Sequence, residues 1–158
     1  MIVKTAQELP VKGRLIGLDF GSKTIGIAIS DGTRTIATPG KTLIRQKWGK
    51  DKLHFEALIK EYNIVGAVIG LPLSMDGSHS SQTDACIAFA NMFATDLNLP
   101  SLMWDERLTT KSAESALFEQ RTGRQKRASK KDVKAKVDSV AAAMILQGTL
   151  DQLSFKMF

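Results

Sequence analysis

Three acidic residues, far apart in the chain, are of the type and placement that support metal-assisted chemistry. Asp19 ends one apolar run, Glu106 follows another, and Asp138 borders the apolar stripe of the last predicted helix. Clustered carboxylates repel one another near neutral pH, and a divalent cation relieves that repulsion. Oxygen ligands alone suit Mg²⁺ or Mn²⁺, and two such ions can activate water and stabilise the leaving oxygen in phosphodiester cleavage. By itself the pattern is weak, because a lone helical Asp138 can also be a solvated surface residue.

The stretch from Arg14 to Gly32, RLIGLDFGSKTIGIAISDG, places the first of these acids. Its first half is an apolar run typical of a buried strand, and Ile25, Ile27 and Ile29 alternate in a second strand. An acid at the end of a central strand, beside glycines, can hold a metal or let a phosphate approach the backbone. The alternative is a hairpin in which Asp19 only caps a turn.

The remaining elements predict an α/β fold. Apolar patterns indicate five strands and four helices; the strands cover 14–20, 24–31, 35–44, 64–71 and 102–104, and the helices cover 50–62, 81–97, a segment opened by Thr109 and Thr110, and 132–153. Pro39 predicts that its strand is at an edge, bulged or interrupted. This order implies a mixed five-stranded sheet with helices on both faces. Ligands of such sheets bind beyond the carboxyl ends of the strands, where Asp19 and Glu106 are expected and the last helix can deliver Asp138.

Length and composition favour one domain. We expect residues 14–153 to form it, between an N-terminal tail (1–13) and a C-terminal tail (154–158). Cys86 is the one cysteine, which excludes an internal disulfide framework. No apolar run approaches the roughly 20 residues of a membrane span, and the first residues lack a signal-peptide pattern. We therefore expect a cytoplasmic protein, monomer or homodimer, that does not associate with membranes.

Positive charge is concentrated in one segment. Residues 121–136 carry eight Lys or Arg and one Asp, a net charge of +7. The net charge of the whole chain is +6, so the rest of the chain sums to −1. A local patch favours a polyanionic partner; a solvated loop is the other interpretation. The candidate nucleic-acid contacts here are Arg121, Arg124, Lys126, Arg127, Lys130 and Lys131. Arg45, Lys47, Lys50 and Lys52 form either a second, weaker basic surface or a solvated loop.

Four ordered motifs resemble the YqgF/RuvX family. They are DFGSKTIG at 19–26, GLPLSMDGS at 70–78, DERLTT at 105–110 and KxxxDSxAAAxIL at 134–146. The resemblance spans Arg14 to Leu150 and implies a ribonuclease H-like fold and a metal-dependent nuclease. The family is described both as a Holliday junction resolvase and as a nuclease that matures the 5′ end of pre-16S rRNA. Its acidic residues correspond here to Asp19, Glu106 and Asp138.

Several assignments stay open at this stage. Adjacent strand residues point to opposite faces, so only one of Asp105 and Glu106 is expected at the metal. Arg107 either contacts a phosphate or pairs with Asp105, and Lys23 either reaches a phosphate or is a solvated turn residue. The family commonly has Asn where this chain has Ser74, and residues before Lys12 lie outside the family pattern.

The leading hypothesis is an endonuclease that acts on structured nucleic acid, with pre-16S rRNA as the expected substrate and Mg²⁺ or Mn²⁺, as two ions, as the cofactor. One alternative is a resolvase of branched DNA. Another is a non-catalytic assembly factor that binds ribosomal particles through the basic segment. An actin-like ATP-binding protein also begins with a D-x-G motif, but that class needs a second phosphate hairpin and a much longer chain.

Overall fold

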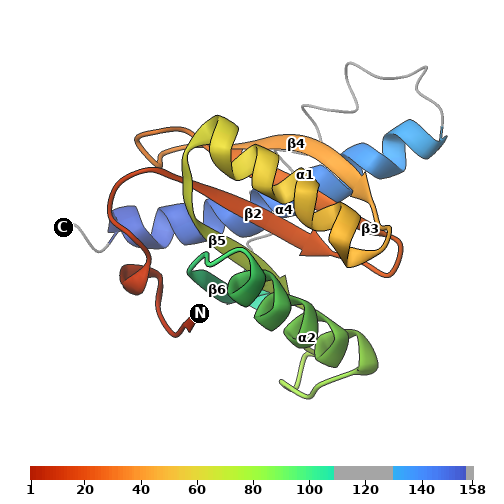
Figure 1. Cartoon of the computed structure of the whole chain (residues 1–158). Coiled ribbons are helices and arrows are strands. Elements are labelled where there is room, and N and C mark those ends of the chain that lie inside the picture. Colours follow the sequence, from red (N-terminus) through yellow and green to blue (C-terminus); the bar gives the residue numbers. More distant parts are fainter. Residues whose placement is uncertain (109–129, 156–158) are drawn as a thin grey trace.

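The computed structural model describes residues 1–108 and 130–155, with the backbone alone for 130–136. These residues form one mixed six-stranded sheet in the order β1-β6-β5-β2-β3-β4 (Figure 1). The strands are β1 (Ile2–Val3), β2 (Arg14–Phe20), β3 (Thr24–Ser30), β4 (Ala37–Ile44), β5 (Ile64–Leu71) and β6 (Ser101–Asp105). The helices are α1 (Trp48–Tyr62), α2 (Ser81–Asp96) and α4 (Lys130–Phe155), with short 3₁₀ turns η1 (Ala6–Glu8) and η2 (Glu106–Leu108).

The central strand β2 sets the geometry of the sheet. It pairs antiparallel with β3, and its other edge pairs parallel with β5, which in turn pairs parallel with β6. Leu15, Ile16 and Leu18 are fully buried, as expected for a strand covered on both faces. Because β2, β5 and β6 run in the same direction, their carboxyl ends meet at one edge of the sheet.

Helices cover both faces, as the element order predicts. One core cluster joins α1 and α2 to the sheet, and the other joins α4 to the opposite face; Figure 1 shows α1 and α2 in front of the sheet and α4 behind it. Along β2, Ile16, Leu18 and Phe20 belong to the first cluster and Leu15 to the second. Since side chains alternate along a strand, Asp19 is directed to the α4 face.

The first thirteen residues are not the coreless tail that the sequence predicts. Ile2 and Val3 pair parallel with Ser101 and Leu102 of β6, which adds a sixth strand to the five expected. Val3, Ala6 and Leu9 are buried in the core cluster that contains α4. Two apolar residues are too few to show a strand period, so the partner strand had to reveal this element.

Other boundaries agree closely with the predictions. β4, which contains Pro39, is an edge strand, and its pairing with β3 shifts register between Gly26 and Ala28, so proline costs the sheet no interior hydrogen bond. A capping box formed by Ser80 and Thr83 begins α2. α4 begins at Lys130, two residues before Asp132, so Lys130 and Lys131 belong to a helix rather than to the predicted loop.

Some predictions fall on residues that the structure does not describe. The helix expected after Thr109 and Thr110, and the basic residues Arg121, Arg124, Lys126 and Arg127, lie between the two described ranges. None of the helices in those ranges is long and apolar enough to cross a membrane.

Candidate active site

The carboxyl ends of β2 and β6 bring two of the predicted acids together. Asp19 is the penultimate residue of β2, and Glu106 follows directly after β6. Burial, and then the negative charge of Asp19, raise the pKa of Glu106, so the two carboxylates interact electrostatically. Gly70, near the end of the intervening strand β5, leaves the room for this approach: a Cβ there would stand 3.2 Å from the Glu106 side chain.

Different elements and contacts separate Glu106 from Asp105. Trp104 belongs to the core on the α4 face and Met103 packs against the other core, so alternation directs Asp105, the last residue of β6, away from the α4 face, whereas Glu106 begins η2. Asp105 is held by the Arg107 guanidinium, whose Nη2 donates to Oδ2 at 2.7 Å and whose Nε donates to Oδ1 at 3.0 Å. Arg107 thereby lowers the pKa of Asp105. Glu106 is therefore the acid that joins Asp19.

The third acid arrives from α4 through an unusually close approach of helix and sheet. A Cβ on Gly26 of β3 would collide with the backbone carbonyl of Asp138, and a Cβ on Gly17 of β2 would stand 2.7 Å from Cβ of Leu146. Only glycine permits such contact at these positions. Thr24 then orients the side chain, since its Oγ1 donates to Oδ2 of Asp138 at 2.9 Å. Sequence analysis missed Thr24 and Gly26, although both lie in the DFGSKTIG motif.

Electrostatics mark this edge as a place where negative charge is costly. Burial, and then the charge of Asp138, raise the pKa of Asp19 from 3.8 to about 6. Burial, then Asp19 and then Asp105, raise the pKa of Glu106 from 4.5 to about 7. The thiol of Cys86 is buried nearby and donates to the Gly70 carbonyl at 3.1 Å, and burial with the charges of Glu106 and Asp19 raises its pKa to about 12. Cys86 is thus a buried core residue whose thiol stays protonated near neutral pH.

The three carboxylates are the type of ligand that a hard divalent cation prefers, but they do not form one compact cluster. Carboxylate oxygens are the ligands that Mg²⁺ and Mn²⁺ prefer, and a cation would relieve the repulsion that raises both pKa values. Yet within residues 1–108 and 137–155 no three His, Cys, Asp or Glu side chains lie close enough to hold one ion together. Asp19 instead neighbours Asp138 on one side and Glu106 on the other. The three carboxylates therefore form two electrostatically coupled pairs that share Asp19.

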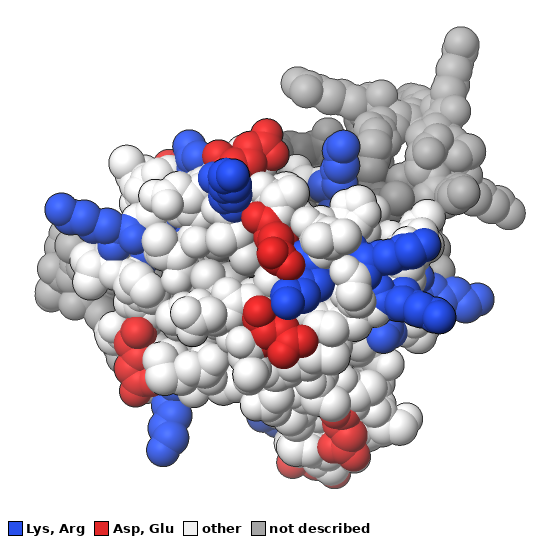
Figure 2. Space-filling view, in the orientation of Figure 1, with Lys and Arg blue, Asp and Glu red and all other residues white. Residues whose placement is uncertain are grey.

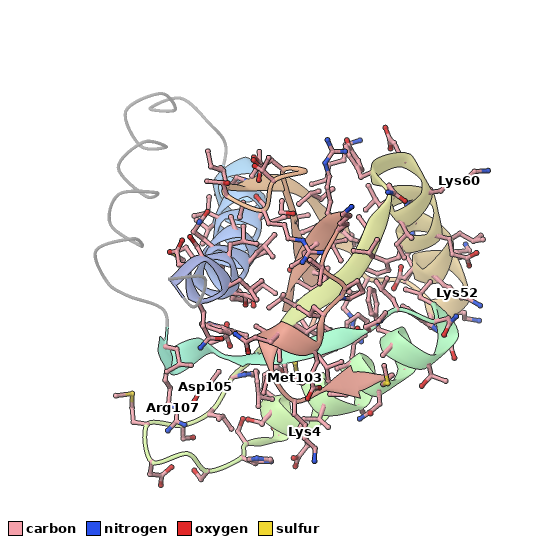
Figure 3. All side chains as sticks on the ribbon, turned by 90° about the vertical axis from the view of Figure 1, so that its left-hand side faces the viewer. Lys4, Lys52, Lys60, Met103, Asp105 and Arg107 are labelled. Carbon is pink, nitrogen blue, oxygen red and sulfur yellow. The ribbon has the colours of Figure 1, made fainter. Side chains whose placement is uncertain are left out.

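Arg107 fastens the loop that borders this edge. Its Nη1 donates to the carbonyl of Met75 at 3.3 Å, in the loop that runs from Pro72 to Ser80 between β5 and α2. Figure 3 shows Arg107 and Asp105 lying together at the end of β6, beside that loop. Of the two predicted roles for Arg107, the structure shows the pairing with Asp105. Lys23 is exposed in the β2–β3 turn, which agrees with either of its two predicted roles.

A family model whose description is "RuvX: Holliday junction resolvase" matches residues 13–152. The chain belongs to the RuvX family. A relative from Novosphingobium aromaticivorans is 46% identical, with all of both chains covered, and one from Cereibacter sphaeroides is 47% identical over 93% of this chain and 88% of its own length. Both carry the name "Putative pre-16S rRNA nuclease".

Solved structures agree on the fold of this RuvX-family chain. RuvC of T. thermophilus, in complex with a Holliday junction substrate, is 11% identical with a TM-score of 0.56, over 89% of this chain and 96% of RuvC. The yeast mitochondrial Holliday junction resolvase Ydc2 is 13% identical with a TM-score of 0.55, over 97% of this chain and 85% of Ydc2. The ribonuclease H-like fold is thereby confirmed, with six strands in place of the predicted five.

Proposed function

We propose that this chain is a metal-dependent endonuclease that cleaves phosphodiester bonds in structured nucleic acid, with pre-16S rRNA as its substrate. The observation that carries the proposal is the convergence of Asp19, Glu106 and Asp138 at one edge of the sheet, where burial and mutual repulsion raise the pKa of two of them. A purely structural edge would pair such charges with cations. The names of the relatives support the choice of substrate, and a cytoplasmic location, where precursor rRNA is present, follows from it.

In this proposal Asp19, shared between the two neighbouring acids, holds Mg²⁺ or Mn²⁺ together with Glu106 and Asp138. When bound, two such ions supply an activated water and stabilise the leaving oxygen. The chain itself supplies orientation: Thr24 fixes the Asp138 carboxylate, and the Asp105–Arg107 pair fixes η2, which carries Glu106. The partial burial of Asp19 and Glu106 limits competition from water for the bound cations.

Substrate affinity is assigned to positive charge outside the acidic edge. Lys23 lies in the turn that follows β2, and α4, which carries Asp138, begins at Lys130 and Lys131. The basic residues Arg121, Arg124, Lys126 and Arg127 precede this helix in the sequence. Each phosphate that such a segment neutralises adds roughly 0.7 to 0.9 to the salt dependence of binding. Binding to a polyanion thus precedes, and is separable from, cleavage at the acids.

The test is a cleavage assay of the purified protein on two substrates, a pre-16S rRNA 5′ leader and a four-way DNA junction, with Mg²⁺, with Mn²⁺ or with excess EDTA. We expect cleavage of the leader that depends on the cation. Preferential cleavage of the junction would favour the resolvase that the family description names. Binding of either substrate without any cleavage would support the non-catalytic assembly factor instead.

Two neighbouring acids supply a matched pair of variants for this assay. Glu106→Gln should abolish cleavage, because Glu106 interacts electrostatically with Asp19. Asp105→Asn should retain most of it, because the Asp105 carboxylate is occupied by Arg107. The reverse result would transfer the proposed metal-binding role from Glu106 to Asp105.

A further inference from the structure

An arginine that the motifs do not include lies against the turn between β2 and β3. Arg45 follows β4, and its backbone N–H donates to the carbonyl of Lys23 at 2.9 Å. Its Nη1 donates to the carbonyls of Gly21 at 3.0 Å and Ser22 at 2.9 Å, and its guanidinium carbon stands 4.3 Å from the centre of the Phe20 ring. Three contacts therefore hold this exposed side chain in one place, against the residues that follow Asp19 in the chain.

The positive charge of Arg45 forms no ion pair with the side chains of residues 1–108 and 137–155. Among the described residues, the ion pairs are His79 with Asp84 and Arg107 with Asp105. The groups that hold Arg45 are neutral carbonyls and an aromatic ring, which orient a guanidinium without cancelling its charge. Arg107, in contrast, is neutralised by its carboxylate. Of these two arginines at the edge of the acidic site, Arg45 is the one still able to bind an anion strongly.

The β2–β3 turn lies between Arg45 and the acids. Thr24, at one end of the turn, holds Asp138 on the α4 face, while Phe20, at the other end, supports Arg45 on the face of α1 and α2. The exposed Lys23 stands between them at the tip. Figure 2 shows Lys and Arg side chains gathered at the end of the molecule where Figure 1 places this turn and the start of α1. A nucleic-acid strand that crosses the turn would meet cations on one side and the carboxylates on the other.

We propose that Arg45 binds a backbone phosphate of the nucleic-acid substrate beside the cleavage site, a role that rests on the proposed function. A planar guanidinium that is already oriented loses little side-chain entropy when it binds, and it matches the geometry of phosphate oxygens. Arg45 is held by the same β2–β3 turn whose Thr24 holds Asp138, so a phosphate bound by Arg45 would lie across that turn from the acids. Arg45 thus contributes affinity and strand placement, while the chemistry stays with the three acids.

Arg14 provides a matched control, because it begins β2 whereas Arg45 contacts the turn at the other end of β2. Its guanidinium carbon lies 5.8 Å from the centre of the Tyr62 ring, and Nη1 donates to the Tyr62 carbonyl at 3.5 Å. It is therefore also an arginine held by an aromatic ring and a carbonyl, but it begins β2 where Arg45 lies beside its end. Arg14→Ala removes the same charge and the same kind of contact far from the acidic edge.

The experiment measures binding of a fluorescent pre-16S rRNA leader at several salt concentrations in EDTA, with the integrity of the RNA checked on a gel. Arg45→Ala should weaken binding roughly tenfold at low salt and lower the salt slope by roughly 0.7 to 0.9. Arg14→Ala should change the affinity and the salt slope by only a small fraction of these amounts. With Mg²⁺ present, Arg45→Ala should raise KM and leave kcat within about threefold, since no transition-state contact is removed.

Two further variants separate phosphate binding from support of the turn. Arg45→Lys keeps the charge on a flexible stem and should restore the salt slope, whereas Arg45→Gln keeps a donor for the turn carbonyls and should not. An unchanged slope in folded Arg45→Ala, an equal loss in Arg14→Ala, or a slope that Arg45→Gln restores would overturn the proposal. Because binding is measured without cleavage, loss of this inference leaves the nuclease function standing, and an inactive wild type that still binds RNA contradicts only the nuclease.

Discussion

The β2–β3 hairpin carries two aspartates that sequence rules treat alike and the structure treats oppositely. Asp19 precedes the turn after β2, and Asp31 follows β3 at the other end of the hairpin. Asp31 accepts hydrogen bonds from Oγ1 of Thr33 at 2.6 Å and from the backbone N–H of Thr35 at 2.7 Å, and these bonds lower its pKa. Burial and the charge of Asp138 instead raise the pKa of Asp19.

The difference between the two residues separates a structural acid from a functional one. Asp31 is the acid that caps a turn, the alternative that the sequence leaves open for Asp19. Its local donors are all within five residues, so its charge stabilises the fold. Asp19 is buried and meets the like charge of Asp138 from α4, so its charge destabilises the fold. Burial with like charges is a common mark of sites that await a ligand.

The largest difference that we expect between the two ends of the β2–β3 hairpin is in nuclease activity. Asp19→Asn should reduce cleavage by more than the roughly 100-fold that loss of a supporting residue around a metal costs, because an amide is a poor ligand. Asp31→Asn should retain wild-type activity whenever the protein is folded. Single-turnover cleavage at saturating enzyme measures both. An active Asp19→Asn variant would remove Asp19 from the proposed site.

Glycines at the two ends provide a second comparison. Gly26→Ala should push α4 away from β3, because the added methyl would collide with the Asp138 carbonyl; we expect about 100-fold lower activity from misplacement of the carboxylate. Gly32→Ala, next to Asp31, meets nothing within 4 Å and should be nearly silent. Cleavage rates and circular dichroism of both variants test this. Equal activities would show that α4 need not approach so closely.

Stability should change in opposite directions at the two ends. Both carboxyls at the acidic edge have a folded-state pKa above the unfolded value, so the folded protein binds extra protons and its stability falls as pH rises from about 4 to about 7. At pH 8 without divalent metal, Asp19→Asn should therefore be more stable than wild type by about 1–3 kcal/mol. Asp31→Asn should be less stable, since the lowered pKa of Asp31 marks stabilisation present above its ordinary pKa. Urea unfolding at pH 5 and pH 8 measures both; a wild type that is as stable at pH 8 as at pH 5 would contradict the mechanism.

The smallest effect is expected from the two threonines that hold the aspartates. Thr24→Val removes the hydroxyl that orients Asp138 and should lower cleavage about tenfold. Thr33→Val removes the hydroxyl that bonds Asp31 and should leave cleavage unchanged. Thr24→Ser keeps the donor and is the control for shape. If Thr24→Ser is as impaired as Thr24→Val, the hydroxyl is not what matters.

Local sequence patterns were sufficient for most of the sheet and for the two long helices of the first hundred residues. The run from Ile64 to Leu71 and the alternating isoleucines of β3 report burial through periodicity, which depends only on neighbours in the chain. Asp19 and Glu106 could likewise be named in advance, because an acid at the end of an apolar strand is visible locally. The motif resemblance then supplied the family, and Asp138 with it.

What the sequence by itself determined is thus the identity of the strands and the acids at their ends; what only the tertiary structure decided is which groups meet. Two residues of β1 gain strand character only from β6, and the pairing with Arg107 is what distinguishes Asp105 from Glu106. The closeness of Asp138 depends on the missing side chain of Gly26, and the placement of Arg45 depends on the ring of Phe20, twenty-five positions away. These are contacts between distant segments, and no local period encodes them.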